Sequence, residues 1–326
     1  MTSSFFMRRA LPLVAGVLTI CAASVALAWT DKPVKMIVPA PAGGTMDIVA
    51  RLLGDQLSND IGAPVIVENK PGAGGAIAVQ GLLAAPVDGQ TIMVTASNVL
   101  TEIPHVMKTA FDPLTSVKPV ATVVRAGMVL IAGPSVPASD FNGMVAFAKA
   151  NPGKLSFASY SSGTSSHYAG MILNQKAGLD LQHVPFAGSP PALTQVVGGQ
   201  IAIMFDGIAT SLPQIKAGKV KALGVAAKSR SSHLPDVPTF TELGYPDLDM
   251  SNWVGVVVAA GMSNELTDKI NAAVNKAAAA PKLRDRLVSA GFEPNAAVSA
   301  TQLAQSVRAD FARNASIVKT FNIQLN

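Results

Sequence analysis

The sequence is poor in cysteine and in charged residues. It has 326 residues, of which one is cysteine, 14% are charged and 49% are hydrophobic. One cysteine excludes an internal disulfide framework and a cysteine-based zinc site. The low charge and high apolar fraction exclude a disordered chain, because such a chain can bury enough apolar surface to offset the entropy of ordering. The length predicts roughly two domains.

The first 28 residues have the pattern of a secretory signal peptide. Arg8 and Arg9 precede an uncharged, mostly apolar run that ends in Ala26-Leu27-Ala28. We predict cleavage after Ala28, an uncleaved N-terminal anchor being the alternative. Cleavage would remove the only cysteine and lower the formal net charge from +5 to +3. No later apolar run reaches the ~20 residues of a transmembrane helix, so we predict an exported, periplasmic protein.

Short β-branched runs alternate with longer helical stretches along the rest of the chain. Strands are expected at 34–40, 65–68, 91–95, 128–132, 155–158, 183–186, 201–205, 220–226 and 254–259. Helices are expected at 45–60, 75–84, 140–150, 164–177, 190–197 and 208–217, then at 264–279, 281–290 and 300–320. This rhythm predicts an α/β protein with parallel sheets covered by helices. The turn-rich stretch 230–249 is expected to return the chain from one lobe to the other.

Three turns rich in glycine or serine each follow an expected strand and open an expected helix. Their candidate residues are Gly43, Gly44, Thr45 and Asp47; Ser162, Gly163, Thr164, Ser165 and His167; and Ala187, Gly188 and Ser189. The glycines allow close approach of backbone to a ligand, and free first-turn amides are anion donors. Thr45 and Ser189 are expected to cap their helices, and Asp47 either complements the helix dipole or contacts the ligand. The sequence therefore predicts a shared crevice for an anionic small molecule.

Other chemistries lack their motifs. A secreted serine hydrolase using Ser165 or Ser162 with His167 is the alternative, but no G-x-S-x-G elbow is present and helical residues two apart do not face each other. His167 is better explained as a support for its loop. The four histidines lack metal-ligand spacing, so we expect no metal and no cofactor. The glycines at 72–75 lack the third glycine of a dinucleotide loop, because position 77 is isoleucine. Lysine and arginine are scattered, so we expect no nucleic-acid partner.

Several motifs occur in a specific order over nearly the whole mature chain. They are PAGGTMD at 41–47, VENKPGAGG at 67–75, NPGKL at 151–155, GTSSH at 163–167, VPFAG at 184–188 and LPDVPTFTELG at 234–244. In these motifs the chain resembles the Bug-type (TctC-like) extracytoplasmic solute receptors, the binding components of tripartite tricarboxylate transporters. The resemblance implies a type II-like periplasmic binding protein with two α/β lobes, a hinge crossed twice and a ligand cleft between the lobes. It implies one lobe of 29–126 plus 252–326 and a second of 127–251.

The resemblance also implies a function and a site. It implies a receptor, not an enzyme, that closes around a mono- or dicarboxylate, aromatic acids included, and delivers it to the transporter's membrane subunits. A sensor partner that presents the bound metabolite would share the same cleft, and we expect a monomer. The implied ligand contacts are the loop Ala42–Asp47, the loops after Ser159 and Phe186, and Ser97, Asn98, Phe205 and Asp206. The chain departs from its relatives at two places. One is the segment that contains His105, and the other is Phe186-Ala187, where relatives more often have tyrosine and lysine.

Overall fold

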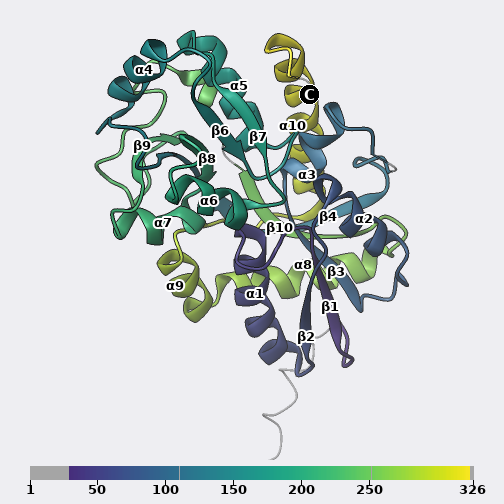
Figure 1. Ribbon diagram of the computed structural model, residues 1–326. Helices are drawn as coiled ribbons and strands as arrows, with labels where there is room; N and C mark the ends of the chain where they lie inside the picture. Colours follow the sequence, from purple (N-terminus) through teal and green to yellow (C-terminus); the bar gives the residue numbers. More distant parts are fainter. Residues whose placement is uncertain (1–28, 110, 251, 324–326) are drawn as a thin grey trace, which may run out of the picture.

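The computed structural model describes residues 29–109, 111–250 and 252–323, so the expected signal peptide and its cleavage site lie outside the described residues. The chain folds into two lobes, each built on one sheet with helices on both faces, which confirms the predicted two-lobe α/β class (Figure 1). Within these residues no helix is both long and apolar enough to span a bilayer.

The first lobe contains a six-stranded sheet in the order β11-β4-β10-β3-β1-β2. Its strands are β1 (Val34–Val38), β2 (Val65–Asn69), β3 (Thr91–Ala96), β4 (Val117–Ala126), β10 (Asn252–Ala259) and β11 (Glu293–Pro294). One face is covered by α1 (Thr45–Ile61), α8 (Asn264–Ala279) and α9 (Pro281–Ser289). The other is covered by α2 (Ala76–Leu83), the short helices α3 (Asn98–Thr101) and η3 (Ile103–His105), and α10 (Ala300–Thr320). The turn η2 (Ala73–Gly75) precedes α2.

The second lobe contains a five-stranded sheet in the order β7-β6-β8-β5-β9. Its strands are β5 (Met128–Ala132), β6 (Ser156–Ser159), β7 (Gln182–Pro185), β8 (Ile203–Gly207) and β9 (Lys221–Ala226). Helices α4 (Phe141–Ala150) and α5 (Ser165–Ala177) pack on one face, and α6 (Ser189–Val197) and α7 (Ile208–Lys216) on the other. The return segment, with the turn η4 (Pro246–Leu248), adds Phe240 and Leu248 to the first of these cores.

Parallel sheets were predicted, but both sheets are mixed. Strands β1, β2 and β3 are parallel to one another, and so are β6, β7 and β8, as the βαβ rhythm predicts. The strands at the lobe crossings differ, because β10 runs antiparallel to β3 and β4, and β5 runs antiparallel to β8 and β9. Strand β4 was not among the expected strands, because Lys118, Pro119 and Arg125 interrupt its apolar pattern.

The C-terminal helix α10 packs against both lobes. Leu303 and Val307, near its start, belong to the core of the first lobe. Farther along, Phe311 contacts His105 of the first lobe, whose ring nitrogen Nε2 lies 2.8 Å from the Phe311 carbonyl oxygen. Phe321 and the buried Ile323 then pack into the core around α4 and α5. The expected assignment of all of 252–326 to the first lobe therefore stays a prediction about which parts move together.

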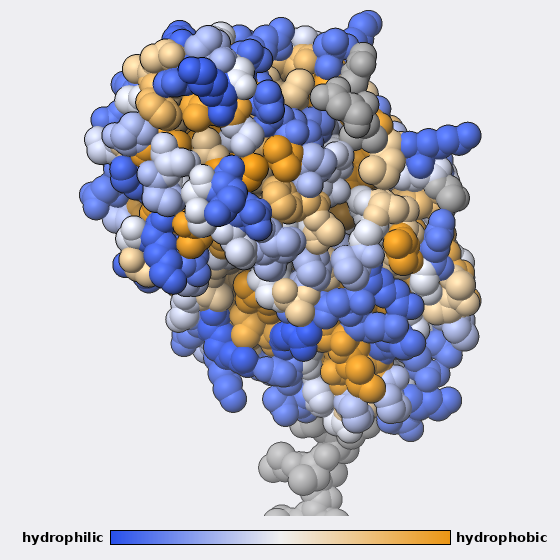
Figure 2. All heavy atoms as spheres, in the orientation of Figure 1, coloured by the Kyte–Doolittle hydropathy of each residue, from blue (hydrophilic) through white to orange (hydrophobic). Residues whose placement is uncertain are grey.

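Hydrophilic residues dominate the visible face of both lobes, with hydrophobic residues scattered among them (Figure 2). The exposed large hydrophobic side chains of the described residues are Ile66, Ile77, Leu83, Val87 and Val288. Scattered surface hydrophobics of this kind are ordinary in globular proteins. The apolar surface that bears on function lies between the lobes.

Candidate functional site

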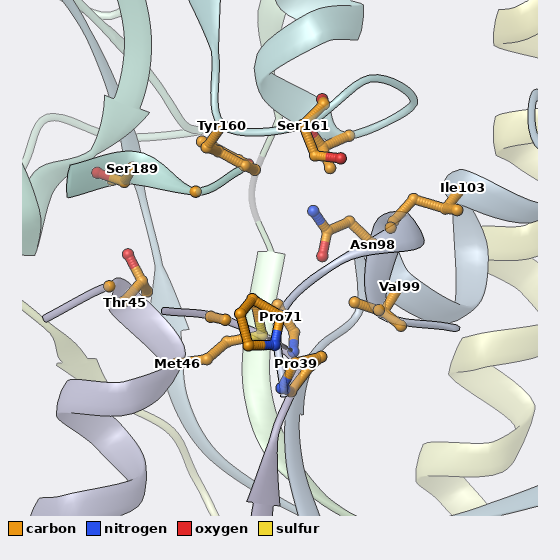
Figure 3. Close-up of a pocket in the computed structure, with 18 of the residues that line it drawn as sticks. Pro39, Thr45, Met46, Pro71, Asn98, Val99, Ile103, Tyr160, Ser161 and Ser189 are labelled. Carbon is orange, nitrogen blue, oxygen red and sulfur yellow. Dashed lines mark hydrogen bonds between the residues drawn. The ribbon is translucent and has the colours of Figure 1, made fainter. Parts of the chain in front are cut away.

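A cavity of about 370 Å³ lies between the two lobes. Its walls come from the loops that follow β1, β2, β3, β6 and β7, from the end of β8, and from the crossings at β4–β5 and at the start of β10. Thr45 and Ser189 lie on one side of it, and Asn98, Val99 and Ile103 on the other (Figure 3). Such a volume suits a small organic molecule.

Among the described residues, the cavity walls carry no acidic or basic side chain. The apolar part of the lining includes Met46, Val99, Ile103, Met107, Met128, Phe186 and Val254. The polar part consists of hydroxyl and amide side chains, at Thr45, Asn98, Tyr160, Ser161, Ser162, Thr164, Ser189 and Asn252. An anion bound here would therefore depend on hydrogen bonds and helix dipoles instead of ion pairs.

Helix α1 opens onto the cavity at Gly44 and Thr45. Gly44 is the N-cap, with φ −77° and ψ 164°, and no side chain caps this helix, so the expected cap at Thr45 is wrong by one position. The helical conformation begins one residue earlier than the hydroxyl pattern suggested, because Gly43 makes the preceding turn at φ 79°. The Thr45 side chain is consequently free to face the cavity (Figure 3).

Asp47 lies behind this loop and holds it. Its carboxylate, 3% exposed, accepts hydrogen bonds from the Gly43 amide at 2.8 Å, from Arg51 Nε at 3.0 Å and from Asn69 Nδ2 at 2.9 Å. Burial alone would raise its pKa, but the hydrogen bonds from Arg51, Gly43 and Asn69 outweigh burial and the pKa is lowered. Two roles were considered for Asp47, contact with the ligand and complementing the helix dipole. Asp47 does not line the cavity, and it lies in the first turn of α1, where an acid complements the dipole.

Helix α6 opens onto the cavity from the second lobe. Its N-cap is Gly188, at φ 124°, and the predicted cap Ser189 is the first helical residue. A left-handed backbone at Gly188 brings it so close to the other lobe that an added Cβ would lie 2.3 Å from Pro41 Cγ. The N-termini of α1 and α6 thus open onto the cavity from opposite lobes, where their loops touch.

The third predicted loop, at the start of α5, uses most of its donors internally. The Gly163 amide donates to His167 Nδ1 at 3.2 Å, and the Thr164 hydroxyl donates to the Ser161 carbonyl at 2.6 Å. The Ser165 hydroxyl, fully buried, donates to the Glu102 carboxyl at 2.6–2.7 Å. His167 therefore supports the loop, as predicted.

Glu102 connects the lobes through a buried network that the sequence did not reveal. It follows Asn98 by one helical turn and reaches Ser165 of the second lobe. Asn252 Nδ2 donates to Ser165 Oγ at 2.6 Å, and Ser97 Oγ donates to Asn252 Oδ1 at 2.7 Å. Burial raises the pKa of Glu102 to about 7, against the hydrogen bond from Ser165. No motif marks Glu102, since its partners come from three distant segments.

The histidines near the site do not form a catalytic pair with serine. His167 stacks on His183 with ring centroids 4.0 Å apart, and burial lowers the pKa of His167 to about 3. His183 Nε2 lies 2.7 Å from the hydroxyl of Ser159, which is fully buried. With Ser165 committed to Glu102, nothing in this region resembles an accessible nucleophile with its base. Across the described residues there is also no cluster of acids, histidines or cysteines suited to a metal ion.

Asp206 and Phe205 lie behind the cavity. Asp206 is fully buried and accepts hydrogen bonds from Thr210 and Ser211, each at 2.7 Å. Burial raises its pKa, against the bonds from Ser211 and Thr210. Phe205 belongs to the second lobe's core. Gly207, which follows Asp206 in the sequence, lines the cavity, whereas Phe205 and Asp206 do not.

The predicted site residues thus divide into two groups. Those that line the cavity are Gly44, Thr45, Asn98, Ser162, Thr164, Ala187, Gly188 and Ser189. Those that lie outside its lining are Ala42, Gly43, Asp47, Ser97, Gly163, Ser165, His167, Phe205 and Asp206. Met46 and Tyr160, in two of the predicted loops, also line the cavity, whereas the lining residues outside the prediction include 71–75, Met107, Gly207 and Asn252. A usable signal existed for 71–75, a glycine-rich strand-to-helix turn that was weighed only as a nucleotide loop.

Comparison with known proteins agrees with this architecture. Residues 49–323 match the model of the tripartite tricarboxylate transporter family receptor. A UPF0065 protein from the tcbD-tcbE intergenic region of Pseudomonas sp. (strain P51) is 34% identical over 267 residues, covering 82% of this chain and 80% of the relative.

Solved structures show the same likeness. The periplasmic binding protein BugD superposes with a TM-score of 0.85 at 32% identity, covering 90% of this chain and 99% of BugD. MatC of Rhodopseudomonas palustris, solved with malate, gives 0.81 at 30% identity over 88% of this chain and 99% of MatC. A second R. palustris protein, solved with adipate, gives 0.87 at 26% identity over 91% and 99%. The chain belongs to the TctC family of Bug-type solute receptors, which are binding proteins and not enzymes.

Proposed function

We propose that this protein is a periplasmic receptor that binds a small carboxylate between its lobes and delivers it to the membrane subunits of a tripartite tricarboxylate-type transporter. The observation that carries the proposal is the convergence of α1 and α6, from opposite lobes, on one uncharged cavity. First-turn amides of a helix have no partner within the helix, and the helix dipole favours an anion at this end. The malate and adipate bound by two relatives support a carboxylate as the solute.

Closure of the lobes is the proposed mechanism. A carboxylate held by α1 amides on one side and on the other by the Ser189 amide of α6, whose next two residues Pro190 and Pro191 have no N–H, stabilises only the arrangement in which both lobes are close. Glycines allow that approach: Gly188 lies against Pro41, and Gly207 lies against Thr45. The ligand therefore acts as part of the contact between the lobes, and its release requires their separation.

Calorimetric titration with paired probes tests carboxylate binding. Hexanoate, benzoate and adipate are compared with hexanamide and benzamide, which keep the carbon skeleton and lack the charge. We expect at least one acid to bind and the amides to bind more weakly, and a ligand at 100 times its Kd to raise the free energy of unfolding by about 2.7 kcal/mol. Equal binding of acids and amides, or no binding of any acid across a broad panel, would contradict the proposal.

The amide of Ser189 can be tested separately from its hydroxyl. Proline is tolerated in the first helical turn, so Ser189→Pro removes the N–H and the hydroxyl, whereas Ser189→Ala removes the hydroxyl alone. Because hydrogen bonds to charged groups are worth about 1.5–3 kcal/mol, we expect the proline variant to bind the best acid at least about tenfold more weakly than the alanine variant. Equal affinities would remove the α6 amide from the site.

A further inference from the structure

Glu102 is a buried acid that both lobes enclose. It follows α3 of the first lobe and is 4% exposed. Its carboxyl group contacts the Ser165 hydroxyl of α5, and its backbone carbonyl oxygen accepts a hydrogen bond of 2.8 Å from the Tyr168 hydroxyl. Ser165 and Tyr168 both belong to the second lobe. The burial of Glu102 therefore depends on the two lobes being close together.

The geometry of the contact with Ser165 points to a proton on the carboxyl group. Ser165 Oγ lies 2.7 Å from Glu102 Oε1 and 2.6 Å from Oε2, and it accepts a hydrogen bond of 2.6 Å from Asn252 Nδ2. A serine hydroxyl has one proton, so it can donate fully to only one of the two carboxyl oxygens. The second short contact becomes a full hydrogen bond when the carboxyl group is protonated and donates to Ser165 Oγ.

The surroundings of Glu102 also favour a neutral carboxyl group. Burial raises its pKa to about 7. The charged groups that face it from α10 act in opposite directions, because Arg313 lowers this pKa and Asp310 raises it, and the two form an ion pair of 3.3 Å. From the second lobe, Tyr160 and Tyr168 face the acid, and burial raises the pKa of both hydroxyls, so both are neutral. A buried carboxylate here would have no cation to itself.

Separation of the lobes would return the Glu102 carboxyl group to water. Ser165 and Tyr168 would move away with the second lobe, and the pKa would return toward the ordinary value of 4.5. The carboxyl group would then have to bind a proton from solvent each time the lobes close near neutral pH. His105 stays neutral in this range, because burial lowers its pKa and its ring lies against the Phe311 carbonyl.

On the basis of the closing carboxylate receptor proposed above, we propose that Glu102, Ser165 and Asn252 form a proton-dependent clasp between the lobes. The closed receptor holds one proton on Glu102, and the open receptor releases that proton to solvent. A group that binds its proton more tightly in the closed form favours closure at acidic pH, and this contribution is lost as pH rises. Because the solute also favours the closed form, binding takes up a proton and weakens in alkaline surroundings.

Calorimetry in buffers of different ionisation enthalpy counts the protons that are taken up on binding. The probe is whichever of hexanoate, benzoate and adipate binds best. With a pKa of about 7 in the closed form and 4.5 in the open form, we expect about 0.9 protons per solute at pH 6 and almost none at pH 8.5. The same two values predict an affinity about tenfold weaker at pH 8.5 than at pH 6.

Glu102→Gln assigns the proton to this residue. Glutamine is neutral at every pH and keeps the size of the protonated acid and one acceptor oxygen. The variant should bind within about twofold of the wild type at pH 6 and about tenfold more tightly than the wild type at pH 8.5. A gain of affinity cannot result from misfolding, and the difference in proton uptake between the two proteins excludes protons bound by the solute.

Glu265→Gln is the matched control. It makes the same change at a side chain that is 80% exposed, so the wild-type proton uptake and pH dependence should remain. Proton uptake that is absent in the wild type, or that persists undiminished in Glu102→Gln, would overturn the clasp and leave the receptor function intact. An affinity of Glu102→Gln at pH 8.5 no higher than that of the wild type would do the same. Failure of every acid to bind would overturn the receptor function and the clasp together.

Discussion

Replacing Gly207 with alanine would place a methyl group between the lobes. Gly207 ends β8 with φ −61° and ψ 137°, a conformation open to any residue, so the substitution does not strain the second lobe's backbone. The added Cβ would lie 2.6 Å from Thr45 Oγ1 of the first lobe and 3.3 Å from Thr210 Oγ1 of its own helix. The contact with Thr45 is roughly 1 Å shorter than the optimal separation of non-bonded atoms.

The expected cost follows from that overlap. Rotation of Thr45 gives little relief, because its β-branched side chain exchanges the hydroxyl for a methyl group. Overpacking of this kind costs about 1–3 kcal/mol, which corresponds to a loss of about 5- to 150-fold in affinity if the lobes must close to bind. The free energy of unfolding without ligand should change little, since the open lobes avoid the contact.

A double-mutant cycle with calorimetry isolates the contact. In a Thr45→Ala background no γ atom remains, so Gly207→Ala should cost much less than in the wild type. Thr45→Val is the matched control, because it lacks the hydroxyl but keeps both γ atoms and should retain the full cost. If Gly207→Ala lowers affinity equally in the alanine and valine backgrounds, or not at all, the reasoning about closure at Thr45 is refuted.

Three further predictions concern stability. Asp47→Asn should lower the free energy of unfolding, measured in urea at pH 7, by about 2–3 kcal/mol, because the Arg51 guanidinium then faces an amide. The difference between variant and wild type should vanish below the lowered pKa of Asp47, and a difference that persisted there would contradict the prediction. Burial raises the pKa of Glu102 from 4.5 to about 7, so the free energy of unfolding of the wild type should fall by on the order of 3 kcal/mol as pH rises through this window. Glu102→Gln should not show this fall. If the stability of both proteins followed the same pH dependence, Glu102 would not be the group responsible. Ile323→Ala should lower the free energy of unfolding by about 2–3 kcal/mol if the segment that follows α10 belongs to the second core. The exposed Val288→Ala should lower it by under about 0.5 kcal/mol, both measured by urea unfolding.

Local periodicity predicted most of the fold. The helix at Asn264–Ala279 and the strand at Met128–Ala132 have the predicted bounds, because each has its own period and clear end signals. Gly291, at φ 93°, supplies the left-handed residue with which helices such as α9 commonly end. Strand β4 was missed since its packing partners, β10 and α8, are more than a hundred residues away and tolerate its charged positions.

The site was less predictable than the fold. Turn chemistry identified the α1 and α6 loops, whose amides depend only on local backbone. It could not show that the hydroxyls of the α5 loop are already bonded, since Ser165 meets Glu102 across 63 residues of sequence. The glycine-rich turn at 72–75 was compared only with a dinucleotide motif. The contacts of Gly74 with Ile103 and of Gly75 with Val99 emerge only when η2 and α3 are placed together.

The packing of α10 against both lobes gives the chain a third tether beside the two strand crossings. Any rotation that separated the lobes would have to bend this helix or detach Phe321 and Ile323 from the second core. The packing of the C-terminal segment would therefore oppose separation of the lobes. Substitutions in its last turn, remote from the cavity, should change how fast a bound solute escapes while every contact to that solute stays the same.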